Sequence, residues 1–218
     1  MRKISILNYG CGNLLSLERA VKEVGHDVKI ISSHKDIKKS DFIILPGVGA
    51  FKNAMELLEN KKFIEPLREF VKEKNKPILG ICLGMQLFFS KSYEMGEHIG
   101  LNFISGEVVS IKTLSKNDNI KIPQINWNKI KIINNSAKKK IISEDINEKS
   151  FYFIHSYMAK VENKENILGY CSYYDLLVPA IIKSENVLGC QFHPEKSGKN
   201  GLKLLKNILS NLWKKKLE

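Results

Sequence analysis

The stretch "PILGICLGMQLFF", residues 77–89, constrains the fold of this chain most strongly. Its first six residues form an apolar run typical of a buried strand, and a helix-like segment follows. Gly80 and Gly84 lie two positions on either side of Cys82. Small residues there would let the backbone bend sharply and project the thiol, while the start of a helix would favour a thiolate. A core strand that ends in a turn with a buried cysteine is the alternative.

The first hundred residues alternate between predicted strands and predicted helices. The strands are expected at 3–8, 27–31, 41–46 and 77–82, and the helices at 13–25, 51–60 and 63–75. Continuous apolar strands separated by amphipathic helices indicate a parallel sheet with helices on both faces.

The pattern changes after residue 100 to shorter segments rich in β-formers. These are expected to be strands at 103–111, 151–157, 167–173, 179–183 and 187–192, with an amphipathic helix at 201–217. The polar segment 112–150 is expected to hold loops or a hairpin. Without an internal repeat or a linker, the sequence predicts one α/β domain over 1–218. Its central sheet would be mostly parallel, with an added antiparallel extension.

The charge balance does not indicate a nucleic-acid partner. Lys and Arg number 35 against 23 Asp and Glu, a formal net charge of +12. Basic residues are scattered, with short clusters at 138–140 and 214–216, and no basic stripe carries interleaved aromatics. We interpret the charge as a compositional bias. No apolar run reaches the length of a membrane span, and no signal peptide begins the chain, so a cytoplasmic protein is expected.

The four cysteines are far apart in the sequence. Cys11, Cys82, Cys171 and Cys190 form no C-x-x-C pair. This argues against a zinc site or a redox motif, and no metal or cofactor is expected.

A candidate base for Cys82 lies in "GCQFHPEKS", residues 189–197. His193 and Glu195 are two residues apart and would project to the same side of an extended chain, with Pro194 fixing the backbone between them. The carboxylate could then hold the imidazole in one tautomer and stabilise the imidazolium. A glycine-flanked cysteine and a His-x-Glu pair in one α/β chain predict nucleophilic catalysis.

A glycine-rich segment, "LPGVGAF" at 45–51, follows a predicted strand. Gly47, Val48 and Gly49 could present backbone N–H groups to a developing oxyanion. A phosphate loop or a plain turn are the alternatives, although the spacing fits neither G-x-x-x-x-G-K-[ST] nor G-x-G-x-x-G.

Taken together, "GICLGMQ" (80–86) and "FHPE" (192–195) resemble the class I, triad-type glutamine amidotransferases, which hydrolyse glutamine to glutamate and ammonia. Further segments are similar to the glutamine amidotransferase subunit of imidazole glycerol phosphate synthase, and the likeness covers essentially the whole chain. They are "NYGCGNLLSLERA" (8–20), "PGVGAF" (46–51), "PQINWN" (123–128), "FIHSY" (153–157) and "QFHPEKSGKNGLKLLKN" (191–207).

The resemblance implies a role for each matching residue. Cys82 would attack the amide carbon of glutamine, His193 would transfer the proton and Glu195 would orient His193. Oxyanion stabilisation and substrate binding would fall to Gly47, Val48, Gly49, Leu83, Gln86, Ser156 and Tyr157. The partner interface would include Trp127 and Lys196.

The resemblance also implies a heterodimer with a (β/α)₈-barrel cyclase. Ammonia would pass to it for imidazole glycerol phosphate and an aminoimidazole ribonucleotide in histidine biosynthesis. Asn8, Asp175 and Val178 stand where aspartate, glycine and phenylalanine are common. These departures leave open a sister subunit that supplies ammonia for amidino-sugars of bacterial surface polysaccharides. A cysteine protease or hydrolase of the same fold would leave "PGVGAF" and "PEKS" unexplained.

Overall fold

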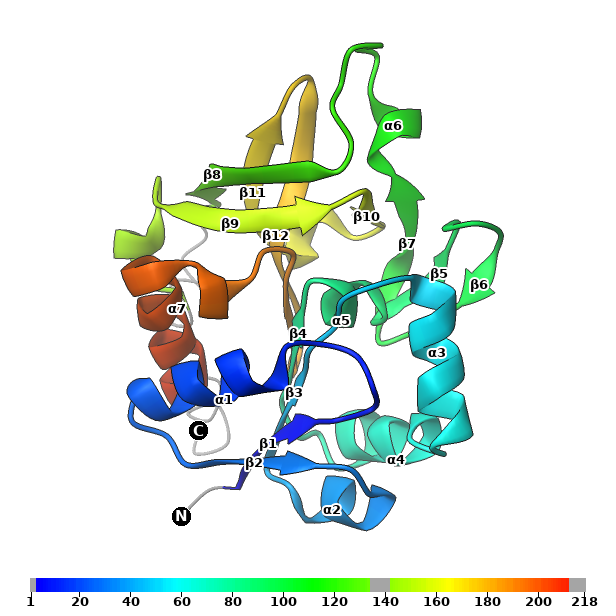
Figure 1. The fold of residues 1–218 in the computed structure, drawn as a ribbon, viewed down its shortest axis with the longest axis vertical. Helices are drawn as coiled ribbons and strands as arrows, with labels where there is room; N and C mark the ends of the chain where they lie inside the picture. Colours follow the sequence, from blue (N-terminus) through cyan, green and yellow to red (C-terminus); the bar gives the residue numbers. More distant parts are fainter. Residues whose placement is uncertain (1–2, 134–141, 212–218) are drawn as a thin grey trace.

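A computed structural model describes residues 3–133 and 142–211 of the chain. A large sheet runs through the molecule, with helices on both faces and a smaller sheet beside it (Figure 1). The first elements are β1 (Ile4–Leu7), α1 (Leu14–Glu23), β2 (Val28–Ile31), α2 (His34–Lys39), β3 (Phe42–Leu45), α3 (Phe51–Asn60), α4 (Ile64–Arg68) and β4 (Ile78–Ile81). They confirm the predicted alternation, to which the structure adds α2. The helix expected at 63–75 is α4 followed by a π-helical turn at Glu69–Glu73.

The remaining elements are mainly strands. They are α5 (Leu83–Gln86), β5 (Phe89–Ser92), β6 (His98–Ile99), β7 (Ile104–Ser110), α6 (Ile111–Leu114), β8 (Gln124–Ile132), β9 (Ser150–His155), β10 (Tyr157–Val161), β11 (Ile167–Tyr173), β12 (Leu176–Ser184), β13 (Val187–Cys190) and α7 (Gly198–Asn211). One-turn 3₁₀ helices lie at Glu144–Ile146, Lys164–Asn166 and Pro194–Lys196.

The structure differs from two of the expectations. The helix expected after Cys82 ends at Gln86, because the carbonyls of 87–89 accept hydrogen bonds from the N–H groups of 101–104 and the chain leads into β5. The nine-residue strand β8 lies within 112–150, where loops or a hairpin were expected. The end of the helix expected at 201–217 and the lysine clusters at 138–140 and 214–216 lie outside the described residues.

The large sheet has the strand order β2-β1-β3-β4-β13-β12-β11-β8-β9. Strands from β2 to β13 pair in parallel, and those from β13 to β9 pair in antiparallel fashion. At the centre, Leu79 of β4 is in register with Ile44 of β3 and Leu188 of β13. This arrangement confirms a parallel sheet with an antiparallel extension.

The smaller sheet has the order β10-β7-β5-β6 and carries the chain away from the end of β4. Strand β9 of the large sheet ends at His155, and β10 of the smaller sheet begins at Tyr157. The chain therefore passes from one sheet to the other at Ser156, close to the segment that follows Cys82.

Hydrophobic clusters cover both faces of the large sheet. One includes Leu17 of α1 and Leu205 of α7, and these two helices lie side by side (Figure 1). The other includes Leu58 of α3 and Leu67 of α4. Because both faces are covered, the side chains of β1, β3 and β4 are all buried, as expected for parallel strands. Among the described residues, no helix has the length and apolar character needed to cross a membrane.

Candidate active site

Cys82 lies on a sharp turn between β4 and α5. Its φ is +54° and its ψ is −112°, a conformation that non-glycine residues rarely adopt. The turn is held by the N–H of Cys82, which donates to the carbonyl of Cys190 at 2.7 Å, and by the N–H of Met85, which donates to the carbonyl of Cys82 at 3.0 Å. Backbone strain of this kind costs about 1–3 kcal/mol and concentrates at functional sites.

The two glycines beside Cys82 are required by close packing. A Cβ at Gly80 would lie 2.6 Å from the backbone nitrogen of Met85, and one at Gly84 would overlap the carbonyl oxygen of Leu45. The chain therefore returns over β4 immediately after the cysteine and lies against the end of β3. This geometry agrees with the predicted strand-to-helix bend.

His193 and Glu195 form a buried pair beside the end of β13. The Nδ1 of His193 lies 2.8 Å from the Oε1 of Glu195, and the side chains are 3% and 4% exposed. The expected extended backbone is wrong here, because Pro194–Lys196 forms one 3₁₀ turn. The carboxylate still reaches the ring, since the turn brings Glu195 back towards His193.

The pKa of His193 is raised in part by the neighbouring Cys82. Burial would lower this pKa, but hydrogen bonding to Cys82 and Glu195 and the negative charges of both groups raise it to about 10. The Nδ1 of His193 is hydrogen-bonded to Glu195. The Nε2 of His193 makes no hydrogen bond of standard geometry among the described residues. The raised pKa means that the His193 ring carries its proton at neutral pH, next to the sulfur of Cys82.

The other three cysteines are in different surroundings. All are buried, and burial raises the pKa of Cys11, of Cys171 to about 11, and of Cys190 further still. A thiol whose pKa is raised carries little thiolate at neutral pH. Cys82 is the cysteine that lies beside an imidazole in the described structure.

The glycine-rich segment 47–49 packs against the turn that carries Cys82. A Cβ at Gly47 would lie 2.7 Å from the backbone nitrogen of Gly84, whereas Gly49 has a φ of +104° and open space around it. Val48 between them is 45% exposed. The N–H of Leu83 is at the first position of α5, where no preceding turn supplies an acceptor. Backbone donors on two sides of the cysteine could thus reach one oxyanion.

Gln86 and Tyr157 meet across the boundary between the two sheets. The Nε2 of Gln86 donates to the backbone carbonyl of Tyr157 at 2.9 Å. Ser156, next to Tyr157, is half-buried and accepts a hydrogen bond from the N–H of Ile111 through its carbonyl. The predicted substrate-binding residues of the two segments are therefore adjacent.

Trp127 and Lys196 are both exposed, as an interface would require. Trp127 is 53% exposed and packs against Tyr152, with ring centroids 5.9 Å apart. The carbonyl of Tyr152 accepts the N–H of His193 at 3.0 Å. Lys196 ends the 3₁₀ turn that carries Glu195. Trp127 is thus linked to His193 through Tyr152, and Lys196 is linked to it through the turn that carries Glu195.

Three residues near the cysteine were not singled out from the sequence. Tyr9 is buried and donates through its hydroxyl to the carbonyl of Pro46 at 2.8 Å, at the entry to 47–49. Gln191 is fully buried and contacts Cys82. His155 has a pKa lowered to about 4, chiefly by burial and also by the charge of His193. Only Gln191 carried a usable signal, since it is two positions before His193.

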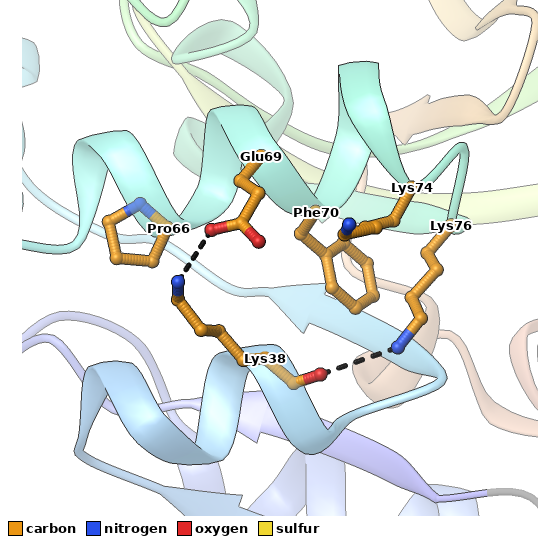
Figure 2. A pocket seen from close by; sticks show the side chains of 6 residues that line it. All are labelled: Lys38, Pro66, Glu69, Phe70, Lys74 and Lys76. Carbon is orange, nitrogen blue, oxygen red and sulfur yellow. Dashed lines mark hydrogen bonds and ion pairs between the residues drawn. The ribbon is translucent and has the colours of Figure 1, made fainter.

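A small pocket at the opposite end of the central strands is structural (Figure 2). The side chain of Lys38 reaches Glu69 at 2.7 Å, and Lys76 donates to the carbonyl of Lys38. Lys38 and Lys76 precede β3 and β4, whereas Cys82 follows β4. The Lys38–Glu69 contact therefore joins α2 to the π-helical turn that follows α4, away from the cysteine. Within the described ranges, no group of three or more His, Cys, Asp or Glu residues could hold a metal ion.

Sequence comparisons identify a family and several relatives of this chain. The family described as "Glutamine amidotransferase class-I" matches residues 5–212. Imidazole glycerol phosphate synthase subunit HisH 1 of Legionella pneumophila (strain Lens) is 42% identical over 212 residues, covering 96% of this chain and 99% of the relative. Subunit HisH of Caldanaerobacter subterraneus subsp. tengcongensis is 46% identical over 205 residues, covering 94% and 96%.

Solved structures share the fold at low identity. A crystal structure of a glutamine amidotransferase superposes with a TM-score of 0.71 at 16% identity, covering 96% of this chain and 98% of that chain. PurLQS from Thermotoga maritima superposes with a TM-score of 0.70 at 18% identity, covering 97% and 99%. With a family match over nearly its full length and relatives above 40% identity, the chain belongs to the class I glutamine amidotransferase family.

Proposed function

We propose that this chain is the glutaminase subunit of imidazole glycerol phosphate synthase, and that Cys82, His193 and Glu195 are its catalytic triad. The observation that carries the proposal is the buried His193–Glu195 pair, 2.8 Å apart, next to a cysteine on a strained turn. The names of the relatives, imidazole glycerol phosphate synthase subunit HisH, support the pathway.

The reaction begins with the thiolate of Cys82 attacking the side-chain amide carbon of glutamine. The carbonyl oxygen becomes an oxyanion in a tetrahedral intermediate. The C–N bond then breaks while the imidazolium of His193 gives its proton to the departing nitrogen, so ammonia leaves and a thioester remains. Glu195 holds the ring at Nδ1, which directs Nε2 towards the reacting atoms.

Hydrolysis of the thioester reverses these roles. His193, now neutral, takes a proton from water as the water attacks the thioester carbon. The C–S bond breaks, glutamate leaves, and the thiolate–imidazolium pair is restored. The N–H of Leu83 and one N–H from the segment Gly47–Gly49 stabilise the oxyanion in both halves of the reaction.

Substrate binding falls to the boundary between the sheets. Gln86, Ser156 and Tyr157 lie there, and their polar groups can hold the α-amino and α-carboxylate ends of glutamine. A free amino acid presents both charged ends, whereas an internal peptide residue presents neither. This arrangement therefore favours glutamine over peptide substrates.

The partner in this proposal is a (β/α)₈-barrel cyclase. Ammonia released into water is protonated and lost as a nucleophile, so the glutaminase is useful when it delivers ammonia directly to a synthase. Trp127 packs against Tyr152, which is hydrogen-bonded to His193, and Lys196 directly follows Glu195. Both side chains are exposed, and they are the proposed contacts with this partner. Asp175 stands where glycine is common in the family, and its carboxylate accepts hydrogen bonds from the hydroxyl of Ser115 at 2.5 Å and from the N–H of Lys116 at 2.8 Å.

The test combines the wild-type chain or its Cys82→Ala variant with an imidazole glycerol phosphate synthase cyclase. The wild-type complex should form imidazole glycerol phosphate from either glutamine or ammonium salts. The variant complex should use only ammonium salts, because the cyclase requires ammonia and not the thiol. A variant that still uses glutamine at the wild-type rate would refute the nucleophile. Failure of the wild-type chain to support the cyclase would refute the pathway.

A further inference from the structure

Gln191 occupies a fully buried position between the cysteine and the residues at the sheet boundary. Its side chain is 0% exposed. Its Nε2 donates to the Sγ of Cys82 at 3.8 Å, and its Oε1 accepts from the Nε2 of Gln86 at 3.0 Å. One amide side chain thus contacts the proposed nucleophile with its donor end and a proposed substrate-binding residue with its acceptor end.

This arrangement determines which end of Gln86 is available. The Nε2 of Gln86 has two hydrogens, and both are used, one by the carbonyl of Tyr157 at 2.9 Å and one by Gln191. Its carbonyl oxygen is therefore the end left for a ligand, and an oxygen acceptor suits the ammonium group of an amino acid. Without the hydrogen bond that Gln191 accepts, one of the two contacts that fix the orientation of the Gln86 amide would be lost.

The donor end of Gln191 acts on the cysteine in its charged state. As a thiol, Cys82 can donate to the carbonyl of Ile154 at 3.8 Å. As a thiolate, it loses that hydrogen bond and can only accept. Gln191 provides a neutral N–H donor for the sulfur, and hydrogen bonds to charged groups are stronger than those between neutral groups. A buried amide dipole in this orientation therefore favours the thiolate.

We propose that Gln191 is a positioning residue that links substrate recognition to the nucleophile, by orienting the Gln86 amide towards the substrate's ammonium group and donating to the Cys82 thiolate. This inference rests on the proposed function. It predicts that replacing Gln191 affects both the pH dependence of Cys82 reactivity and the binding of glutamine. A residue that only fills space would affect neither.

The chain offers a matched control in Gln124. This glutamine is also 0% exposed, and its Nε2 donates to the Sγ of Cys171 at 3.4 Å and to Asn128 at 3.0 Å. It therefore makes the same kind of contact to a cysteine outside the proposed triad. Gln124→Met should lower stability in a similar way without changing the chemistry of Cys82.

The experiment measures the rate of Cys82 alkylation by iodoacetamide as a function of pH, using the full chain and following the Cys82 peptide by mass spectrometry. The same measurement with added L-glutamine gives the dissociation constant of glutamine from the protection of Cys82. Gln191→Met removes both hydrogen bonds with little change in volume. Gln191→Glu keeps an acceptor but places a carboxylate beside the sulfur, and it serves as the second variant if Gln191→Met does not fold.

We expect Gln191→Met to lower the alkylation rate at neutral pH by about 3- to 30-fold, to move its pH midpoint upward and to weaken glutamine protection about tenfold. Gln191→Glu should move the midpoint further upward, because a carboxylate repels the thiolate. Gln124→Met should match the wild type in all three measurements.

Wild-type profiles in the Gln191 variants would overturn the inference while leaving the triad in place. In contrast, a wild-type chain in which Cys82 reacts no faster than Cys171 would overturn the proposed nucleophile itself. The two failures are separated because the second is visible without any variant.

Discussion

The backbone of Gly84 packs directly on the carbonyl group of Leu45, so that a Cβ at residue 84 would overlap the Leu45 oxygen. This contact joins the turn that carries Cys82 to the end of β3, from which the segment 47–49 departs. The proposed nucleophile and the proposed oxyanion donors are therefore held together by backbone contact, and the absence of a side chain at residue 84 makes that contact possible.

Gly84→Ala should disrupt this contact. The added methyl group must push the turn away from β3, which we expect to cost about 1–3 kcal/mol of stability and most of the glutaminase activity. Urea denaturation and glutamine turnover measure the two effects. Gly25→Ala is the control, since Gly25 has a φ of +89° but open space around it. It should cost about 1–2 kcal/mol and leave turnover unchanged. Full activity in Gly84→Ala would contradict the proposed role of this contact.

Replacing Cys171 or Cys190 by serine should affect stability and not chemistry. Cys190 is 0% exposed on β13, and a hydroxyl there would lack a partner, so Cys190→Ser should cost about 1–3 kcal/mol in urea denaturation. Cys171→Ser should cost less, because Gln124 already donates to residue 171. Either variant should keep its glutaminase rate when folded. A large loss of rate at full stability would show that another cysteine takes part in the chemistry.

The sequence predicted those parts of the site that depend on neighbouring residues. The glycine spacing around Cys82 predicted the strained turn, because the clash that Gly80 avoids, with the backbone of Met85, lies within the same short segment. His193 and Glu195 were paired correctly, although the 3₁₀ turn at Pro194–Lys196 was not expected. Short-range geometry can be satisfied by more than one backbone conformation, so the contact was easier to predict than the turn.

Contacts between distant segments could not be predicted in the same way. Gln191 contacts Gln86 across 105 residues and Cys82 across 109. Its place two positions before His193 indicates a shared side of the strand, but it identifies neither of these two partners. The segment that contains β8 was expected to hold loops or a hairpin because it is polar. Most residues of β8 are exposed in the structure, which explains its polar sequence. The period of apolar residues reports burial, and a strand that buries little gives a weak signal.

The raised pKa of His193 makes a prediction about pH. In the proposed mechanism its imidazolium protonates the departing ammonia, so activity should persist above neutral pH and fall as the ring loses its proton, around its pKa of about 10. Glu195 helps raise this pKa. Glu195→Gln should therefore lower the pKa and move the alkaline fall in kcat to lower pH. It should also reduce the maximum kcat by about 10²–10⁴, because the ring loses its orientation.

The measurement is kcat for glutamine between pH 6 and 10.5 in the cyclase complex. Glu165→Gln is a suitable control, since Glu165 is an exposed carboxylate in the 3₁₀ turn after β10. It should leave the profile unchanged. An alkaline fall in Glu195→Gln at the same pH as in the wild type would contradict the role of Glu195 in holding the proton on His193.

Glutaminase activity should be low in the free subunit and rise when the cyclase and its ligand bind. Gly49 has open space and a φ of +104°, so the peptide between Gly47 and Gly49 can reorient at small cost. Turning one N–H towards the oxyanion only in the complex would avoid wasteful hydrolysis. The loss of one such donor costs about 10²–10³ in rate. Turnover is compared in the free subunit, the complex, and the complex with synthase ligand. Equal rates in all three would refute this control without affecting the triad.

Tyr9→Phe tests where this control resides. The hydroxyl of Tyr9 donates to the carbonyl of Pro46 at 2.8 Å and fixes the entry to the segment 47–49. Without it, the peptide should reorient more readily, so the free subunit should become faster and the stimulation by the partner should shrink. Tyr174→Phe, at a tyrosine 48% exposed, is the control and should leave the stimulation unchanged. If Tyr9→Phe lowers the rates of the free subunit and the complex by the same factor, Tyr9 supports the site as a whole and does not restrain the segment.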